Sequence, residues 1–339
     1  MKKTKGLLFV ILIFAGLTLS ACGDDGTAES ASDEDEGKTY EFKMSYVTQT
    51  GHIWHKFAEK FAEELDAKSD GRMTLDLYPA AQLGPEADMV QQLESGSLDF
   101  AVLTVPYLST RFPELDAWNM PFLFEDLEAS LAAQDTEPAQ DMLGLLEEQG
   151  LRGMDYFFAA NHNLLVNGDP ITSLDDVDGR KLRFTGGESV LDFWEGLGAS
   201  PIAMGLPEVY NAMQTGVIEG VSVDTNPMLS EKYHEIGENY VLTNHMAFGG
   251  IVTGSQSNYE NMPKGDQEIL NEALSEAVQW GEEKIVADED DNLKELEDLV
   301  NVIELKNREE FIEEAEKMYE KYSEKNELIK KFIEEVREQ

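Results

Sequence analysis

The chain has 339 residues, with 68 acidic against 26 basic side chains and a formal net charge of -42, so a polyanionic nucleic acid is excluded as a partner. Its single cysteine excludes an intramolecular disulfide and a cysteine-rich zinc site. A chain of this length is typical of about two domains with ordinary hydrophobic cores, and the acidic excess suits a saline exterior.

The first segment resembles a bacterial lipoprotein signal. Three lysines among the first five residues precede an apolar run from Gly6 to Leu19, which is shorter than the roughly 20 residues of a membrane-spanning helix. Leu19-Ser20-Ala21-Cys22 follows. The resemblance implies that residues 1–21 are a signal peptide and that Cys22 becomes a lipidated N-terminus. An ordinary secretory signal and a buried thiol are the alternatives.

The next segment, residues 22–38, has the composition of a disordered acidic linker. It contains small and polar residues and the run Asp33-Glu34-Asp35-Glu36, with no large apolar side chain. A segment with so little to bury does not fold by itself. We therefore expect the folded part to begin near residue 39.

Beyond the linker, the hydrophobic period alternates between that of a strand and that of a helix. The pattern predicts a strand at Tyr40–Val47, a helix through Trp54 and Leu65, a strand at Arg72–Tyr78, a helix at Glu86–Leu93 and a strand at Phe100–Val105. This β-α-β-α-β order predicts a mainly parallel sheet with ligands at the carboxyl ends of its strands.

A second series of elements follows helical stretches around 127–149. Strands are predicted at Met154–Phe158, Leu164–Asn167, Lys181–Phe184 and Gly220–Asp224, and helices at Val190–Leu197 and Pro207–Gln214. The C-terminal part is predicted to be helical, because apolar residues from Phe311 to Val336 recur at intervals of three and four, with Lys325 interrupting the stripe. A helix packing on its own domain is favoured over a coiled-coil partner.

Motifs for catalysis or metal binding are scarce. The chain has no Gly-x-Ser-x-Gly elbow, no phosphate-binding Gly-x-x-x-x-Gly-Lys and no Gly-x-Gly-x-x-Gly. His52 and His55 stand three apart at a predicted helix start, but no third metal ligand is evident, so capping or packing is the favoured role. No catalytic residue, metal or cofactor is predicted.

Several short blocks follow one another along the chain beyond the linker. They are Tyr78-Pro79 to Gln82-Leu83-Gly84, Gly96-Ser97-Leu98-Asp99-Phe100, Met120-Pro121-Phe122-Leu123-Phe124, Leu174 to Arg183, Gly198-Ala199-Ser200-Pro201, Glu208-Val209-Tyr210, Gln214 to Gly220 and Thr243-Asn244-His245. No single block is specific to one family. The ordered set, which extends over nearly the whole chain beyond the linker, resembles the DctP-type solute-binding proteins of tripartite ATP-independent periplasmic (TRAP) transporters.

The resemblance implies a periplasmic-binding-protein-like α/β fold, in which two α/β domains exchange strands and are joined by a hinge and a long helix. On this basis we expect domain I at 39–160 plus about 249–288, and domain II at 161–248 plus about 289–339, including the C-terminal helices. The implied function is to capture an organic carboxylate between the domains and deliver it to a membrane permease. The expected protein is a monomer held by the lipid on Cys22 at the outer face of the cell membrane, or on the periplasmic side.

The family pattern also implies a ligand-binding arginine in the Lys-Leu-Arg strand, which here is Arg183. Lys181 and Arg183 share one face of this strand, which lets Arg183 point into the cleft. A guanidinium binds a carboxylate through two parallel hydrogen bonds. Some relatives have a second arginine twenty residues earlier, where this chain has the neutral Asn163. A monocarboxylate or sugar acid is therefore favoured over a C4-dicarboxylate, although His52 or His162 could replace the second arginine.

Other candidate ligand-binding positions follow from the same pattern. They are Glu86, Thr104, Tyr107, His245, and Ser222 with Val223, which replace a polar pair of many relatives. Four aromatic residues, Trp54, Trp118, Phe157 and Phe158, fit either the pocket wall or the core, and the core is the more usual place. The alternative function, a surface-anchored enzyme on a two-domain α/β scaffold, has no nucleophile motif to support it.

Overall fold

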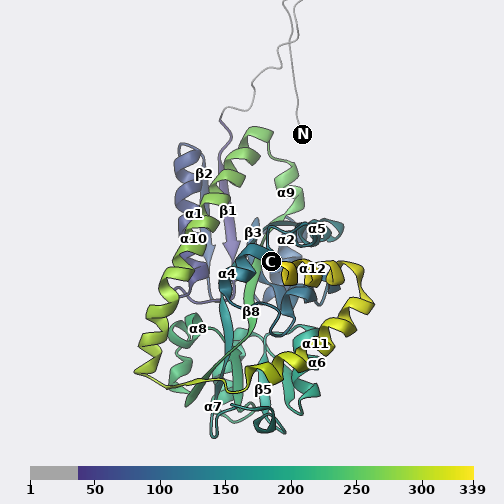
Figure 1. Ribbon diagram of the computed structural model, residues 1–339. Coiled ribbons are helices and arrows are strands. Elements are labelled where there is room, and N and C mark those ends of the chain that lie inside the picture. Colours follow the sequence, from purple (N-terminus) through teal and green to yellow (C-terminus); the bar gives the residue numbers. More distant parts are fainter. Residues whose placement is uncertain (1–36) are drawn as a thin grey trace, which may run out of the picture. The chain divides into compact units, whose positions relative to one another are not determined.

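The computed structural model describes residues 37–339. The predicted signal peptide, Cys22 and most of the predicted linker lie outside the described residues. Residues 37–339 form one compact unit around a nine-stranded sheet of order β2-β1-β3-β8-β4-β7-β5-β6, with β9 paired to β8 (Figure 1). Helices cover both faces of the sheet, as in the α/β class that the sequence predicts.

One end of the sheet is the predicted β-α-β-α-β unit. It consists of β1 (Tyr40–Ser45), α1 (Ile53–Lys68), β2 (Met73–Tyr78), α2 (Glu86–Glu94) and β3 (Phe100–Thr104). The strands are parallel, with β1 between β2 and β3. The helix α1 buries Trp54, Phe57, Phe61 and Leu65 completely, which is the face that the helical spacing predicts.

The other end repeats this arrangement with shorter strands. It comprises β5 (Lys181–Phe184), α6 (Glu188–Gly196), β6 (Ser200–Ala203), α7 (Leu206–Gln214) and β7 (Gly220–Val223). Here β5 pairs in parallel with both β6 and β7. Four of these five elements were expected from the sequence. The exception is β6, whose four residues include Pro201 and follow a glycine turn.

Two long antiparallel strands join the ends. They are β4 (Leu151–Val166) and β8 (Asn239–Ser255). Near its C-terminal end β8 pairs antiparallel with β3, and β4 pairs antiparallel with β7. The short β9 (Asn301–Glu304) lies parallel to β8. The sheet is therefore parallel at both ends but antiparallel in the centre, where the sequence predicted a mainly parallel sheet.

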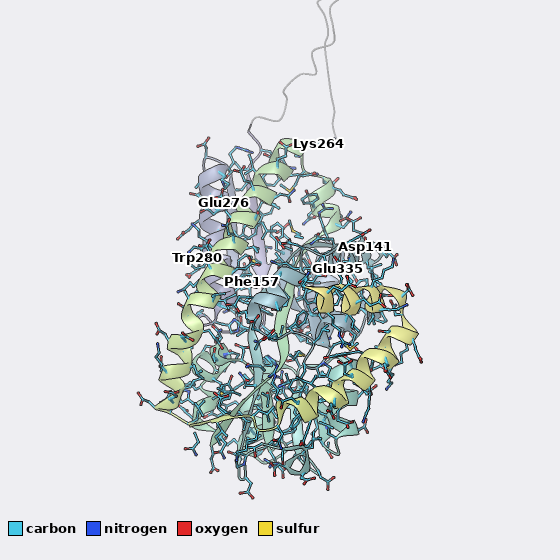
Figure 2. All side chains as sticks on the ribbon, in the orientation of Figure 1. Asp141, Phe157, Lys264, Glu276, Trp280 and Glu335 are labelled. Atoms are coloured by element: carbon cyan, nitrogen blue, oxygen red, sulfur yellow. The ribbon has the colours of Figure 1, made fainter. Side chains whose placement is uncertain are left out.

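The longest helix, α10 (Lys264–Glu297), runs beside both ends of the sheet (Figure 1). It contacts α1 at one end and α8 (Thr225–Ser230) at the other, and it crosses β4 between them. Gly281 lies against the ring of Phe157 on β4, and a Cβ at this position would lie 2.4 Å from that ring. Figure 2 shows Phe157 beside α10. Glycine thus lets the helix approach the strand closely.

The C-terminal stripe is divided between α11 (Arg308–Lys325) and α12 (Glu327–Glu338). The break follows Lys325, because the Asn326 side chain accepts hydrogen bonds from the backbone of Leu328 and Ile329 and so caps α12. Phe311 and Phe332 are fully buried, so the stripe packs within this chain, although not on the predicted domain II alone. The helix α11 contacts α6, whereas α12 contacts α5 (Glu137–Leu145) and the 3-10 helix at Pro113–Asn119.

Three short helices complete the described chain: α3 (Val105–Leu108), α4 (Leu127–Ala133) and α9 (Gln256–Glu260). Within residues 37–339, no helix combines the length and the apolar character that a membrane span requires.

Candidate ligand-binding site

A small cavity lies where the two ends of the sheet face each other. One wall comes from the β1–β3 end: Val47, Thr48, His52, Trp54, Glu86 and Thr104. The opposite wall comes from the β5–β7 end and the central strands: His162, Arg183, Thr185, Leu206, Ser222, Val223, Asp224, Pro227 and Phe248. The cavity measures about 20 Å³, which is room for about one water molecule.

Arg183 is a buried cation in the wall of this cavity. The strand β5 places it between the core residues Leu182 and Phe184, and its side chain is 1% exposed. Its Nε donates a hydrogen bond to the carbonyl of Met204 at 2.8 Å, and Nη1 donates to the carbonyl of Ser222 at 3.4 Å. Its Nη2 is buried without a hydrogen-bond partner. Burial lowers the pKa of Arg183 to about 10, so the guanidinium stays charged at neutral pH.

Glu86 and Thr104 are held together at the carboxyl end of β3. A Glu86 carboxylate oxygen accepts a hydrogen bond of 2.6 Å from the Thr104 backbone N–H. The Thr104 hydroxyl in turn accepts one from the backbone N–H of Tyr107 and caps α3. Burial raises the pKa of Glu86 to about 7, against the opposing effect of these hydrogen bonds and of Arg183. Glu86 is therefore a carboxyl that titrates near neutrality.

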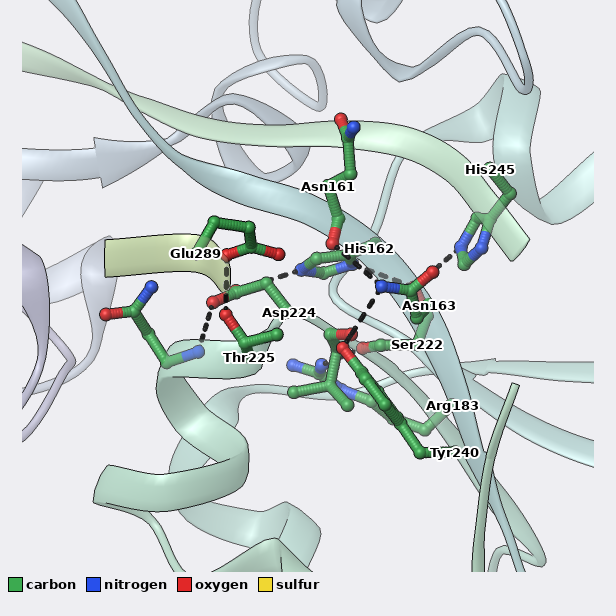
Figure 3. Close-up of polar contacts among 12 residues, drawn as sticks. Asn161, His162, Asn163, Arg183, Ser222, Asp224, Thr225, Tyr240, His245 and Glu289 are labelled. Atoms are coloured by element: carbon green, nitrogen blue, oxygen red, sulfur yellow. Dashed lines mark hydrogen bonds and ion pairs between the residues drawn. The ribbon is translucent and has the colours of Figure 1, made fainter. Parts of the chain in front are cut away.

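A chain of buried polar side chains runs from the cavity into the core (Figure 3). A hydrogen bond of 2.8 Å joins His162 Nδ1 to the Ser222 hydroxyl, and another of 2.8 Å joins that hydroxyl to His245 Nε2. His245 Nδ1 lies 2.7 Å from the Thr243 hydroxyl. At the cavity end, His162 Nε2 lies 3.5 Å from Asp224 Oδ2, which is longer than a normal hydrogen bond.

The histidines of this region are neutral at physiological pH, because burial lowers the pKa of each. The pKa of His52 falls to about 4, that of His162 lies below its usual value, and that of His245 lies well below it. His52 caps α1 by accepting the backbone N–H of Trp54 at Nδ1, which leaves the proton on Nε2. That Nε2, the Trp54 indole N–H and the Thr48 hydroxyl are all buried without a hydrogen-bond partner.

The side chain of Asn163 forms hydrogen bonds with other residues of the protein. Its amide nitrogen donates to the Tyr240 hydroxyl at 3.1 Å, and its amide oxygen accepts from the backbone N–H of Asn244 at 2.8 Å. The Tyr240 hydroxyl donates to the carbonyl of Val223. Asn163 thus ties β4 to β7 and β8, and it is not part of the cavity lining.

Of the residues singled out in the sequence, the structure brings eight into the lining of one cavity, on its two walls: Arg183, Glu86, Thr104, Ser222, Val223, Trp54, His52 and His162. Three candidates lie behind that wall. They are Asn163, His245, which reaches the cavity through Ser222, and Tyr107, which contacts Thr104 through its backbone. Trp118, Phe157 and Phe158 are core residues.

Sequence reasoning missed several cavity residues, notably Thr48, Thr185, Asp224 and Phe248. Asp224 follows β7 directly, and the carboxyl end of a strand is where ligand contacts are expected. Asp224 could not be singled out in the sequence, because the chain has 68 acidic residues. Phe248 lies on β8, a strand that the sequence pattern did not indicate.

The described residues 37–339 contain no group of three His, Cys, Asp or Glu side chains arranged to hold a metal ion. The helix start with two histidines has other contacts: His52 caps α1, and His55 contacts the Tyr46 hydroxyl and Glu59.

Comparison with known proteins shows that the chain is similar to bacterial solute-binding proteins. Residues 44–326 match the model of the DctP family, described as bacterial extracellular solute-binding protein, family 7. The chain is 31% identical over 278 residues to a solute-binding protein of Sulfitobacter sp. (strain NAS-14.1), covering 80% of this chain and 83% of that protein. It is 26% identical over 242 residues to the C4-dicarboxylate-binding periplasmic protein DctP of Rhodobacter capsulatus, covering 70% and 72%.

Among solved structures, the fold is similar to that of a sugar acid binding protein from Advenella mimigardefordensis in complex with galactonate. The TM-score is 0.85 at 23% sequence identity, over 89% of this chain and 99% of that chain.

Proposed function

Because the chain belongs to the DctP family of extracellular solute-binding proteins, we propose that it captures a small organic carboxylate in the cavity around Arg183. Proteins of this family are extracytoplasmic, bind small organic acids and work with a membrane permease. They are transport proteins and not enzymes, so the alternative of a surface-anchored enzyme is set aside.

The observation that carries the proposal is the unpartnered guanidinium nitrogen in the cavity wall. A buried charge without a full set of partners is costly, and the missing partner of Arg183 Nη2 is an acceptor. A ligand carboxylate supplies two acceptor oxygens and a compensating charge. Arg183 is then the group that binds the carboxylate of the solute.

The lining of the cavity favours a ligand with one carboxylate over a ligand with two. Asn163, which stands where some relatives have a second arginine, donates its amide to Tyr240 and presents no cation to the cavity. The remaining ionisable groups of the cavity lining, on both walls, are two carboxyls, Glu86 and Asp224, and two neutral histidines. A second ligand carboxylate would therefore be buried without a cationic partner, at a cost of several kcal/mol. We rank monocarboxylates and sugar acids above C4-dicarboxylates.

The arrangement of the walls supports the two-domain proposal, with domain I at 39–160 plus about 249–288 and domain II at 161–248 plus about 289–339. The two walls come from opposite ends of the sheet, and a cavity of about 20 Å³ is too small for a sugar acid. The ligand therefore enters when the domains move apart about the central strands. Closure then places the ligand between the walls.

Three further features of the proposed protein rest on the sequence. We propose a lipid anchor on Cys22, a monomeric state, and delivery of the solute to the membrane subunits of a TRAP permease. An anchor on Cys22 would keep the protein at the membrane that holds its permease.

Titration calorimetry on the purified protein with lactate, pyruvate, gluconate, galactonate and succinate tests the proposed function. We expect at least one monocarboxylate to bind and to be recovered unchanged by mass spectrometry under non-denaturing conditions. Tight binding of succinate with no response to any monocarboxylate would overturn the charge argument. Absence of binding by every acid would overturn carboxylate capture itself.

A further inference from the structure

The carboxylate of Asp224 is the most unusual group of the cavity apart from Arg183. It is 0% exposed, it lines the cavity, and its Oδ2 has no hydrogen-bond partner. Its other oxygen accepts the backbone N–H of Asn226 at 2.9 Å and so caps α8. One oxygen of this buried carboxylate therefore has a hydrogen-bond partner in the protein, and the other has none.

The hydrogen-bond chain behind Asp224 has a fixed direction, because an ionised carboxylate only accepts hydrogen bonds. His162 Nε2 must carry a proton to face Asp224, so its Nδ1 accepts from Ser222. The Ser222 hydroxyl, which donates its hydrogen bond to His162 Nδ1, accepts one from His245 Nε2. Every donor in the chain thus points toward Asp224, as expected around a negative charge.

This chain supports the charge of Asp224 without satisfying it. The closest donor, His162 Nε2, is neutral and 3.5 Å away, beyond the 2.7–3.2 Å of a normal N–H···O bond. Burying an ionised carboxylate with one acceptor position open is costly unless another donor reaches it. Because Oδ2 lies in the wall of the ligand cavity, that donor has a place to come from.

We propose that Asp224 is the second anchoring group of the site, and that it accepts a hydrogen bond from a hydroxyl or an ammonium group of the ligand. The inference rests on the proposed function, in which Arg183 binds the ligand carboxylate. Arg183 and Asp224 then select a ligand with two different ends. One end is a carboxylate that accepts hydrogen bonds from the guanidinium of Arg183, and the other is a donor group that binds the carboxylate of Asp224. A second carboxylate is rejected by direct repulsion from Asp224, and a plain alkyl end leaves Oδ2 unsatisfied.

The neighbouring groups refine the class of ligand. His52 Nε2–H and the Trp54 indole N–H are further unpartnered donors in the opposite wall of the cavity. A hydroxyl can donate to Asp224 and accept from such a donor at the same time, whereas an ammonium only donates. The cavity therefore matches hydroxylated carboxylic acids, in which several hydroxyl groups serve both kinds of partner.

Two matched sets of acids test the inference by calorimetry. The three-carbon set is lactate, alanine, propionate and malonate. The six-carbon set is gluconate, 6-hydroxyhexanoate, 6-aminohexanoate, hexanoate and adipate. Within the set that binds, we expect the acids with a hydroxyl or ammonium donor to bind at least tenfold tighter than the unsubstituted acid and the diacid. The hydroxy and amino members then show which donor Asp224 accepts.

Asp224→Asn is the decisive variant, because it keeps the shape of the side chain and removes its charge. We expect the preference for donor-bearing acids to fall at least tenfold, and binding of the diacid to improve. Glu289→Gln is the matched control. It neutralises a carboxyl that accepts from the hydroxyl of neighbouring Thr225 but does not line the cavity, so the preference should stay within about twofold.

Three results would overturn the inference. One is an unsubstituted acid or diacid that binds the wild-type protein as tightly as the donor-bearing acids, a result that needs no variant to fold. Another is an unchanged preference in folded Asp224→Asn, and the third is an equal loss in Glu289→Gln. In each case carboxylate capture at Arg183 would still stand. If no acid of either set binds, the proposed function fails and this inference fails with it.

Discussion

At the scale of single residues, Arg183 gives the most direct prediction. Arg183→Ala should weaken binding of the carboxylate ligand by about 3 kcal/mol or more, because it removes one partner of a buried charge pair. Arg183→Lys should recover only part of this loss, since an ammonium cannot form two parallel bonds to a carboxylate. Titration calorimetry with the tightest-binding acid measures both.

Arg180 is the matched control for these variants. It lies three residues earlier, donates to the backbone carbonyls of Asn167 and Asp169, and does not line the cavity. Arg180→Ala should leave the affinity within about twofold. If Arg183→Ala binds as tightly as Arg180→Ala, Arg183 does not contact the ligand.

The raised pKa of the Glu86 carboxyl leads to a prediction of how ligand affinity depends on pH. Below its pKa of about 7 this carboxyl is neutral, and above it the ionised form repels an anionic ligand. Affinity should therefore fall as pH rises from 6 to 8, by less than tenfold per unit. His52 does not contribute in this range, because burial lowers its pKa to about 4. Burial also lowers the pKa of His162 below its usual value. Calorimetry at pH 6, 7 and 8 measures the slope.

Glu86→Gln separates this effect from others. The amide stays neutral at every pH, so the variant should bind with a nearly flat profile at the level that the wild type reaches near pH 6. A wild-type profile without slope, or a slope that persists in Glu86→Gln, would show that Glu86 does not face the bound anion.

At the scale of elements, the contact between α10 and β4 predicts a position-specific effect of one methyl group. Gly281→Ala should destabilise the protein by about 1–3 kcal/mol, because the new Cβ overlaps the buried ring of Phe157. Gly265→Ala in the same helix meets no atom within 4 Å and should be neutral or stabilise by up to about 1 kcal/mol. Urea unfolding monitored by circular dichroism compares the two. Equal stability of both variants would contradict the close approach.

Elements with a regular apolar period were predictable from the sequence. Of the two central strands, β4 was predicted as two separate strands and β8 was not predicted. Along β4 the register shifts at three bulges, one of them between His162 and Leu164. The polar stretch Asn161-His162-Asn163 therefore divided one strand into two predicted ones. In β8, Asn244 has a φ of +43° and Gly249-Gly250 interrupt the apolar pattern, so no strand was expected there. Both irregularities lie beside the cavity.

The candidate site was predictable to the extent that it follows family motifs. Arg183, Glu86 and Thr104 sit at strand and helix ends that the sequence marks clearly. The residues that complete the wall, such as Asp224 and Phe248, come together only through the pairing of β4 with β7 and β8. Pairing between distant segments leaves no local pattern in a single sequence.

At the scale of the whole molecule, we expect ligand binding to shift the protein toward a more compact form. The two walls of the cavity already touch at their edge, where the Gln49 backbone N–H donates to Glu231 at 3.2 Å. A ligand that contacts both walls stabilises this closed form by its differential affinity for it. Small-angle scattering should show a smaller radius of gyration with a saturating acid than without it. An unchanged radius with bound ligand would contradict domain closure.

The net charge of -42 predicts an unusual salt dependence of association. Cleavage of the proposed signal peptide, residues 1–21, would remove three lysines and no acid and would change the net charge from -42 to -45. At 0.01 M salt this field extends about 30 Å and repels an anionic ligand, whereas at 0.15 M it extends about 8 Å. The association rate measured by stopped flow should therefore rise with added salt. A rate that falls would show that local attraction by Arg183 outweighs the general field.

The long helix α10 connects the two ends of the sheet, and this connection has a consequence for ligand binding and release. It spans about 50 Å, at 1.5 Å per residue over 34 residues, and it touches α1 at one end and α8 at the other. If the domains close as proposed, α10 connects two parts that move relative to each other, so it must bend or slide along one of its contacts. Bending in the closed form would cost free energy and would weaken ligand binding. The stiffness of a helix remote from Arg183 would then contribute to how tightly the solute is held.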